Sequence, residues 1–208
     1  GLASGNYNIV VQVQGDPSCT VTYSGNPVVI NVAPVTPTVN AVANQSLCNG
    51  AATTTVTFSG STPGTVYNWT NNNTSIGLAA SGTGNIASFT ATNATAAVVT
   101  ATITVTPTFT NAGGTCTGTP IQFTITVNPT PTITCPANIT LNSPAGQCGI
   151  VVNYPPATAT GVPAPVITYS IPSGTFFPVG VTTVTATATN SCGVVTCTFT
   201  VTVLDVTA

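Results

Sequence analysis

A pattern of strand, Gly- or Asn-bearing loop, cysteine, strand and proline occurs three times along the chain. The first copy reads NIVVQVQ, GDPSC and PVVINVAP and ends at Pro34. The second reads VVTATITVTP, NAGGTC and IQFTITVNP and ends at Pro129. A looser third copy reads TTVTATATN, then two cysteines, then FTVTVLD. Each copy has the form of the last two strands of a β-sandwich, so the sequence predicts sandwich modules in series.

Apolar and polar residues alternate within these copies. The clearest runs are ATITVT (101–106), QFTITV (122–127), TTVTATAT (182–189) and TCTFTVTV (196–203). A period of two with many β-branched residues is typical of half-buried strands, in which Val, Ile or Phe faces the core and Thr faces water. The good helix formers Lys, Arg and Met are absent. We therefore expect an all-β fold of tandem β-sandwiches, with no helix.

The repeats divide the chain into predicted domains. These are the final hairpin of a truncated sandwich (1–34), a whole sandwich (35–129) and a second whole sandwich (130–208). Pro34, Pro37, Pro129 and Pro131 lie at the joints, and proline restricts the backbone, so short, stiff linkers and a rod are expected. Because the opening GLASGNYNIVV is typical of the middle of a β domain, we also expect the chain to be a fragment.

Charge is almost absent from the 208 residues. Asp16 and Asp205 are the two acidic residues, and there is no Lys, Arg or His. Without cations the chain cannot neutralise phosphates, so we expect no nucleic-acid partner and no polybasic contact with lipid. No apolar run approaches the roughly 18 residues of a membrane helix, so no direct membrane insertion is expected.

The same composition argues against catalysis and metal binding. Ser and Thr nucleophiles need a base such as His or Lys, and the chain has neither. Asp16 and Asp205 fall in different predicted domains, and two carboxylates are too few for a calcium site. Asp16 is expected in a GDPS turn and Asp205 at the end of a strand. We predict no enzyme activity, no catalytic residue, no metal and no cofactor.

The seven cysteines favour disulfides and an oxidising compartment. A zinc site is the alternative, but Cys192 and Cys197 are five apart, Cys135 and Cys148 are thirteen apart, and no CxxC pair or His is present. The chain is therefore expected to be extracellular.

The third segment resembles the hyalin repeat (HYR) family. The matching stretches are CPANITL (135–141), GQCGIVVNY (146–154), PSGTFFPVGVTTVTATATN (172–190) and TCTFTVTVLD (196–205). The resemblance implies an immunoglobulin-like sandwich of extracellular, adhesive proteins. Many members carry Asp-Asn-Cys between the second and third strands, where this chain reads ATATGVPAP. Cys192 is expected to serve instead of that cysteine.

The second segment resembles the PKD-like repeats of very large Bacteroidetes surface proteins, including gliding-motility adhesins. The matching stretches are LCNGAATTTVTFSG (47–60), VYNWTN (66–71), IGLAASGTGNIASFTATN (76–93) and CTGTPIQFTITVNPTP (116–131). The resemblance implies tandem, non-catalytic modules that are secreted through the outer membrane and tethered at the cell surface.

Disulfide pairs follow from the folds that these resemblances imply. The first and last strands of the HYR fold run parallel from the same end, which favours Cys135 with Cys197 and leaves Cys148 with Cys192. In the second domain, Cys48 and Cys116 join the first strand to the last hairpin. Cys19 remains, and the repeat places its partner upstream of this chain; a free thiol or a crosslink between subunits is the alternative.

Trp69, in YNWT, is predicted to be a core tryptophan, with sugar stacking as the alternative. Tyr169, Phe176 and Phe177 are interpreted as core or loop anchors. The Thr ladders are interpreted as the solvent face of a sheet rather than an ice-binding surface. Glycosylation stays open at six N-x-S/T sequons: Asn44, Asn68, Asn72, Asn73, Asn93 and Asn138.

Three functions are compatible with these features. The first is a spacer in a long cell-surface adhesin, whose partners are neighbouring repeats of the same polypeptide. The second is a subunit of an extracellular filament, assembled with neighbouring subunits by strand addition. The third is a carbohydrate-binding module for surface glycans or polymers, which rests on analogy of fold.

Overall fold

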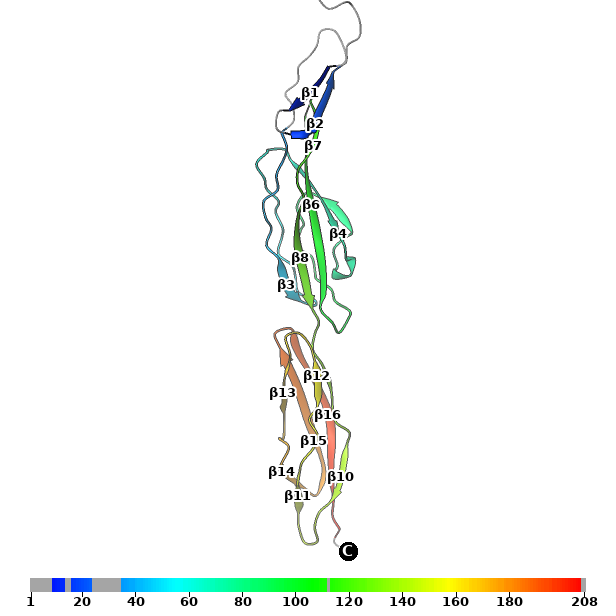
Figure 1. The fold of residues 1–208 in the computed structure, drawn as a ribbon. Helices are drawn as coiled ribbons and strands as arrows, with labels where there is room; N and C mark the ends of the chain where they lie inside the picture. The colour runs from blue at the N-terminus through cyan, green and yellow to red at the C-terminus, as the bar shows by residue number, and fades with distance from the viewer. Residues whose placement is uncertain (1–8, 14–15, 24–34, 112, 207–208) are drawn as a thin grey trace, which may run out of the picture. The chain divides into compact units, whose positions relative to one another are not determined.

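The computed structural model describes residues 9–13, 16–23, 35–111 and 113–206 (Figure 1). These residues form β-strands and loops, with one 3-10 turn at Thr74–Ile76 and no α-helix. The predicted all-β class is confirmed. The chain divides into two compact units, each formed by several segments. The first unit comprises residues 1–45, 52–90 and 100–126, and the second comprises 46–51, 91–99 and 127–208.

Among the described residues, eight strands precede residue 129. They are β1 (Ile9–Val13), β2 (Asp16–Tyr23), β3 (Gln45–Cys48), β4 (Val66–Asn71), β5 (Ser81–Thr83), β6 (Val99–Asn111), β7 (Gly114–Thr117) and β8 (Ile121–Asn128). β1 and β2 form an antiparallel pair. A sheet of six strands has the order β3-β8-β6-β4-β5, with β7 paired to β6.

The long strands β6 and β8 show the predicted alternation. Ile103 and Val105 are fully buried in β6, and Phe123 and Ile125 are buried in β8. The threonines between them point to the other face of the sheet, where Thr100 and Thr126 share a hydrogen bond of 3.1 Å across the two strands. The apolar face of this sheet forms the core of the first unit.

Eight strands follow residue 129 in the described range that ends at residue 206. They are β9 (Thr132–Thr134), β10 (Ile139–Asn142), β11 (Gly149–Val152), β12 (Thr158–Thr160), β13 (Val166–Tyr169), β14 (Thr175–Pro178), β15 (Gly180–Asn190) and β16 (Gly193–Leu204). The main sheet has the order β10-β16-β15-β13, in which β10 and β16 are parallel (Figure 1). β11 pairs with β14, and β12 pairs with β9.

The hairpin of β15 and β16 supplies much of the second core. Eleven residues of β15 pair with β16, from Gly180 opposite Val203 to Asn190 opposite Gly193. Its buried side chains pack with those from β11, β14 and the loop after β11. This core consists of Val152, Tyr154, Phe177, Val184, Phe199, Val201 and Val203.

The structure differs from the prediction at the loop that carries the cysteine of the repeat. In the first copy, Asp16 begins strand β2, which runs through the position of Cys19, rather than lying in a turn. In the second copy, Cys116 lies on β7, which folds back on the end of β6 with Phe109 opposite Cys116. A tight glycine turn allows this return, since Gly114 has φ 133°.

Candidate functional site

The Cys135–Cys197 disulfide lies in the second unit. Its Cα atoms are 5.8 Å apart, and the pair matches the predicted one. Cys197 is on β16, and Cys135 precedes β10, which runs parallel to β16. Cys135 also packs against the second core. With a separation of 62 residues, this crosslink stabilises the folded state by about 4 kcal/mol in the chain-entropy model.

The second described disulfide joins Cys48 to Cys192, with Cα atoms 5.2 Å apart and a sequence separation of 144. Two predicted pairs, Cys48–Cys116 and Cys148–Cys192, are therefore wrong. Cys192 occupies the two-residue turn between β15 and β16, where its N–H donates to Asn190 Oδ1 at 2.8 Å. Cys48 ends β3 on the segment 46–51, which belongs to the same compact unit as Cys192.

Cys148 is too far from Cys192 to pair with it. Its carbonyl accepts a hydrogen bond from Val179 N at 2.9 Å, immediately before β15 begins. Cys192 follows the other end of β15. An eleven-residue strand spans about 35 Å, whereas bonded cysteines have Cα atoms within about 7 Å. The predicted pair rests on elimination, since joining Cys135 to Cys197 leaves these two cysteines in the HYR segment.

Cys116 is disulfide-bonded and fully buried, although Cys48 is not its partner. The prediction for Cys19 concerns a side chain outside the described residues. The Asp16 side chain lies outside them too.

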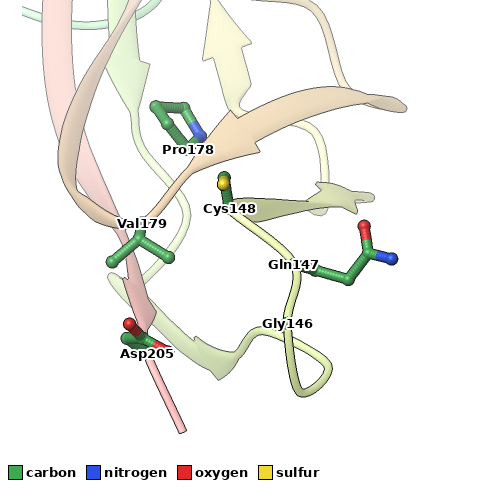
Figure 2. Close-up of a pocket in the computed structure, with 6 residues that line it drawn as sticks. All are labelled: Gly146, Gln147, Cys148, Pro178, Val179 and Asp205. Carbon is green, nitrogen blue, oxygen red and sulfur yellow. The ribbon is translucent and has the colours of Figure 1, made fainter. Parts of the chain in front are cut away.

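Cys148 has an exposed free thiol beside a pocket of about 350 Å³ (Figure 2). The pocket is lined by Gly146, Gln147, Cys148, Pro178, Val179 and Asp205. The chain has no His, Lys or Arg to act as a base for this thiol. The pocket thus offers a thiol and a carboxylate but not the partners that nucleophilic catalysis needs.

Trp69 is buried, with 7% of its side chain exposed. It lies on β4 opposite Gly82 of β5, and its Nε1 donates to Gly84 O at 3.2 Å. The indole lies so close to Gly82 that a Cβ there would be 2.2 Å from Trp69 Cζ2. Trp69 is therefore a core residue, and its ring is not exposed for stacking on a sugar.

The other aromatic candidates divide between core and surface. Phe177 is fully buried, whereas its neighbour Phe176 is 57% exposed on the outer side of β14. Tyr169 is half-buried, and its hydroxyl accepts a hydrogen bond from Ala157 N at 2.7 Å. Phe176 is the one of the three that contributes to the surface.

Tyr154 links this aromatic group to the second core. Its ring packs edge-on against Phe199 at 4.9 Å and lies 5.4 Å from Tyr169. Its hydroxyl donates to the Ile171 carbonyl oxygen. Burial, and then the neighbouring Tyr169, raise the pKa of Tyr154 above its ordinary value of 10.0. The hydroxyl therefore stays neutral and keeps its structural hydrogen bond.

The part of the chain that the structure describes lacks the features of two other classes of site. It groups no three His, Cys, Asp or Glu side chains in a way that could hold a metal ion. It also contains no helix of the length and apolarity that a bilayer crossing requires.

A known family model matches the C-terminal part of the chain. The HYR domain model matches residues 128–203, so the predicted HYR resemblance is confirmed for that segment. The search of curated proteins found no match.

Among solved structures, the chain is similar to tandem immunoglobulin domains. Sidekick-1 immunoglobulin domains 1–5 are 15% identical with a TM-score of 0.41, over 81% of this chain and 39% of that one. Titin I-band fragment I67–I69 is 10% identical with a TM-score of 0.45, over 83% and 67%. Drosophila OTK extracellular domains 3–5 are 17% identical with a TM-score of 0.40, over 81% and 60%.

HYR domains are typically extracellular. The chain spans 39% of the length of the Sidekick-1 structure. Residues 128–203 match the HYR domain, an immunoglobulin-like repeat typical of cell-surface and adhesion proteins.

Proposed function

We propose that this chain is a spacer segment of a large secreted bacterial cell-surface adhesin. In this proposal a PKD-like sandwich (35–129) and the HYR sandwich (130–208) follow the hairpin of a preceding module (1–34). The modules form a rod that provides reach and mechanical continuity. The PKD-like resemblance extends the proposal to the gliding-motility adhesins of Bacteroidetes, which are exported and held at the cell surface.

The HYR match over residues 128–203 is the observation that carries this proposal. The disulfides Cys48–Cys192 and Cys135–Cys197 support it, because such bonds persist outside the cell. The Cys48–Cys192 bond also shortens the covalent path that carries a force between the two ends of the chain. A pulling force passes from Cys48 directly to Cys192, so residues 49–191 lie outside the stretched path. Limited extension is a useful property for a spacer.

The mass of the native, disulfide-intact protein tests the spacer role. A spacer belongs to a polypeptide several times larger than the 20.6 kDa of this chain. Mass spectrometry or calibrated gel electrophoresis of material from the outside of the producing cells should therefore show a much larger species. A native species of about 20.6 kDa would contradict the spacer role.

A filament subunit is the second candidate, favoured by strand β13. This strand lies at the end of its sheet order and carries Val166, which is 68% exposed. An edge strand with unpaired backbone groups accepts an added strand. A native mass near 20.6 kDa in an assembly that dissociates into single chains would support this candidate instead. No carbohydrate-binding role is proposed, because Trp69 is buried.

A further inference from the structure

Six asparagines stand in N-x-S/T sequons, and their side-chain amides differ in what they bind. An N-linked glycan replaces one hydrogen on Nδ2, so an occupied site needs an exposed Nδ2 that the fold does not use. The hydrogen bonds of the described residues can therefore sort the six. They are Asn44, Asn68, Asn72, Asn73, Asn93 and Asn138.

In three of these asparagines, the side-chain Nδ2 donates a hydrogen bond to another residue of the fold. Asn93 is buried, and its Nδ2 donates to Ala97 O at 2.7 Å and to Val127 O at 2.8 Å. Asn68 Nδ2 donates to a threonine hydroxyl at 3.2 Å, and Asn73 Nδ2 donates to a backbone carbonyl at 3.4 Å. Asn93 Nδ2 uses both of its hydrogens in these bonds, so a glycan there would remove one of them, and this asparagine is excluded as a site.

Asn44 and Asn138 occupy equivalent positions in the two halves of the chain. Each residue immediately precedes a strand, β3 or β10, and each is exposed. Asn44 Oδ1 accepts from Thr124 N on β8 at 2.8 Å, and Asn138 Oδ1 accepts from Thr200 N on β16 at 2.9 Å. The oxygen thus anchors the side chain, while Nδ2 makes no hydrogen bond to any described residue.

Asn72 shows the same arrangement at the end of β4. Its Oδ1 accepts from Thr102 N at 2.8 Å, its side chain is exposed, and its Nδ2 has no partner among the described residues. A backbone N–H therefore holds the amide oxygen of all three asparagines, with the nitrogen left to solvent.

The Ser or Thr hydroxyl two residues after each of these asparagines is not used in the hydrogen bonds of the described fold. Ser46, Thr74 and Thr140 are exposed, and their hydroxyls form no hydrogen bond within the described ranges. Anchoring the asparagine oxygen does not need that hydroxyl, whereas recognition of a sequon does. The fold therefore explains the asparagine at each of these positions, but it does not explain the Ser or Thr that completes the sequon.

We propose that Asn44, Asn72 and Asn138 are N-glycosylation sites. The donor is an oligosaccharide on a polyprenyl diphosphate, used by a membrane oligosaccharyltransferase. The glycan C1–O bond to the diphosphate breaks, a C1–Nδ2 bond forms, the Nδ2 proton passes to a base of the transferase, and polyprenyl diphosphate leaves. The proposal goes beyond the spacer function and requires only that the chain crosses a membrane where such a transferase works.

Glycans at Asn44 and Asn138 would protect sheet edges that this chain cannot protect with charged side chains. β3 and β10 are end strands of their sheets, and exposed edges invite association between chains. Proteins commonly protect such edges with charged side chains, especially Lys, but this chain has no Lys and only two charged residues, both Asp. A bulky, hydrated glycan at the start of each edge strand would supply the protection that charge does not.

Peptide mass spectrometry of the native protein tests the proposal. Trypsin has no site in this chain, but chymotrypsin places the four decisive asparagines on separate peptides, ending at Leu47, Leu78, Phe109 and Leu141. Electron-transfer fragmentation should locate a hexose- or N-acetylhexosamine-containing glycan on Asn44, Asn72 and Asn138. The peptide with Asn93 should be unmodified. Unmodified asparagine at all three proposed sites, or a glycan on Asn93, would overturn the proposal.

Variants in the producing organism separate glycosylation from structure. Ser46→Ala and Thr140→Ala remove the sequons but keep each asparagine and its hydrogen bond. Each should lose the glycan at its own site, fold normally, and aggregate more readily than the parent. The matched control is Thr95→Ser, which keeps the sequon of Asn93 and should change no glycan. A glycan that persists after Ser46→Ala or Thr140→Ala would contradict the proposal.

Discussion

Cys48 and Cys192 form a disulfide although 144 positions separate them in the sequence. The bond ties the segment 46–51 to the turn between β15 and β16 within one compact unit. It closes a much longer loop than Cys135–Cys197, whose separation is 62. The unfolded chain therefore loses much of its freedom while this bond is intact.

Replacing the pair with Cys48→Ser and Cys192→Ser should lower the free energy of unfolding by about 2–5 kcal/mol. Chemical denaturation of the parent and the double variant, without reductant, measures this difference. Cys148→Ser is the matched control, because Cys148 is exposed and unbonded, and it should change the stability by less than about 0.5 kcal/mol. Equal stability of parent and double variant would show that the Cys48–Cys192 bond does not form.

Gly82→Ala should destabilise the first unit by about 2–4 kcal/mol, because its Cβ would collide with the Trp69 ring. Tryptophan fluorescence during denaturation reports on the site directly, since Trp69 is the single tryptophan of the chain. Ser81→Ala, at an exposed neighbour on the same strand, should have little effect. If Gly82→Ala were as stable as Ser81→Ala, the burial of Trp69 against Gly82 would be wrong.

The adjacent residues Phe176 and Phe177 provide a second comparison. Phe177→Ala should cost about 3–5 kcal/mol, because Phe177 is fully buried in the second core. Phe176→Ala should cost less than about 1 kcal/mol, because Phe176 is mostly exposed. Thermal unfolding of the two variants gives the order of stability, and a reversed order would mean that β14 presents its opposite face to the core.

Much of this fold follows from local pattern, as the strands show. The alternating runs predict β6, β8, β15 and β16, and the buried Phe199 falls on the expected face. A period of two determines which side chains face inward without any knowledge of distant residues. The HYR segment is predicted on another basis, the resemblance of its motifs to that family.

The disulfides and the hydrogen bonds to asparagine side chains depend instead on which segments, distant in sequence, lie close together in the fold. The bond between Cys48 and Cys192 joins two positions whose local sequences do not indicate that they lie close together in the fold. The hydrogen bond from Thr124 N to Asn44 Oδ1 spans 80 positions and depends on the register of β3 beside β8. The Gly and Asn before Cys116 predict a loop there, but the tight turn lets the chain return as strand β7. Local composition identified the turn and not the strand that follows it.

Stability should fall in alkaline solution because of Tyr154. Its pKa is raised in the folded state, so the unfolded chain loses this proton first as the pH increases. The stabilisation is fully present below the unfolded pKa of about 10 and is lost as the pH rises toward the folded pKa. Denaturation at pH 8 to 11 should show this decline in the parent and a smaller one in Tyr154→Phe. An equal decline in both would exclude Tyr154 as its cause.

The extension of single molecules under force tests the spacer function most directly. With the disulfides intact, a chain held by its two ends should extend by no more than about 230 Å, because the Cys48–Cys192 bond removes residues 49–191 from the path. After reduction, the same chain should extend to about 750 Å at about 3.6 Å per residue. An intact chain that extends as far as the reduced one would contradict a spacer whose length is limited by its disulfides.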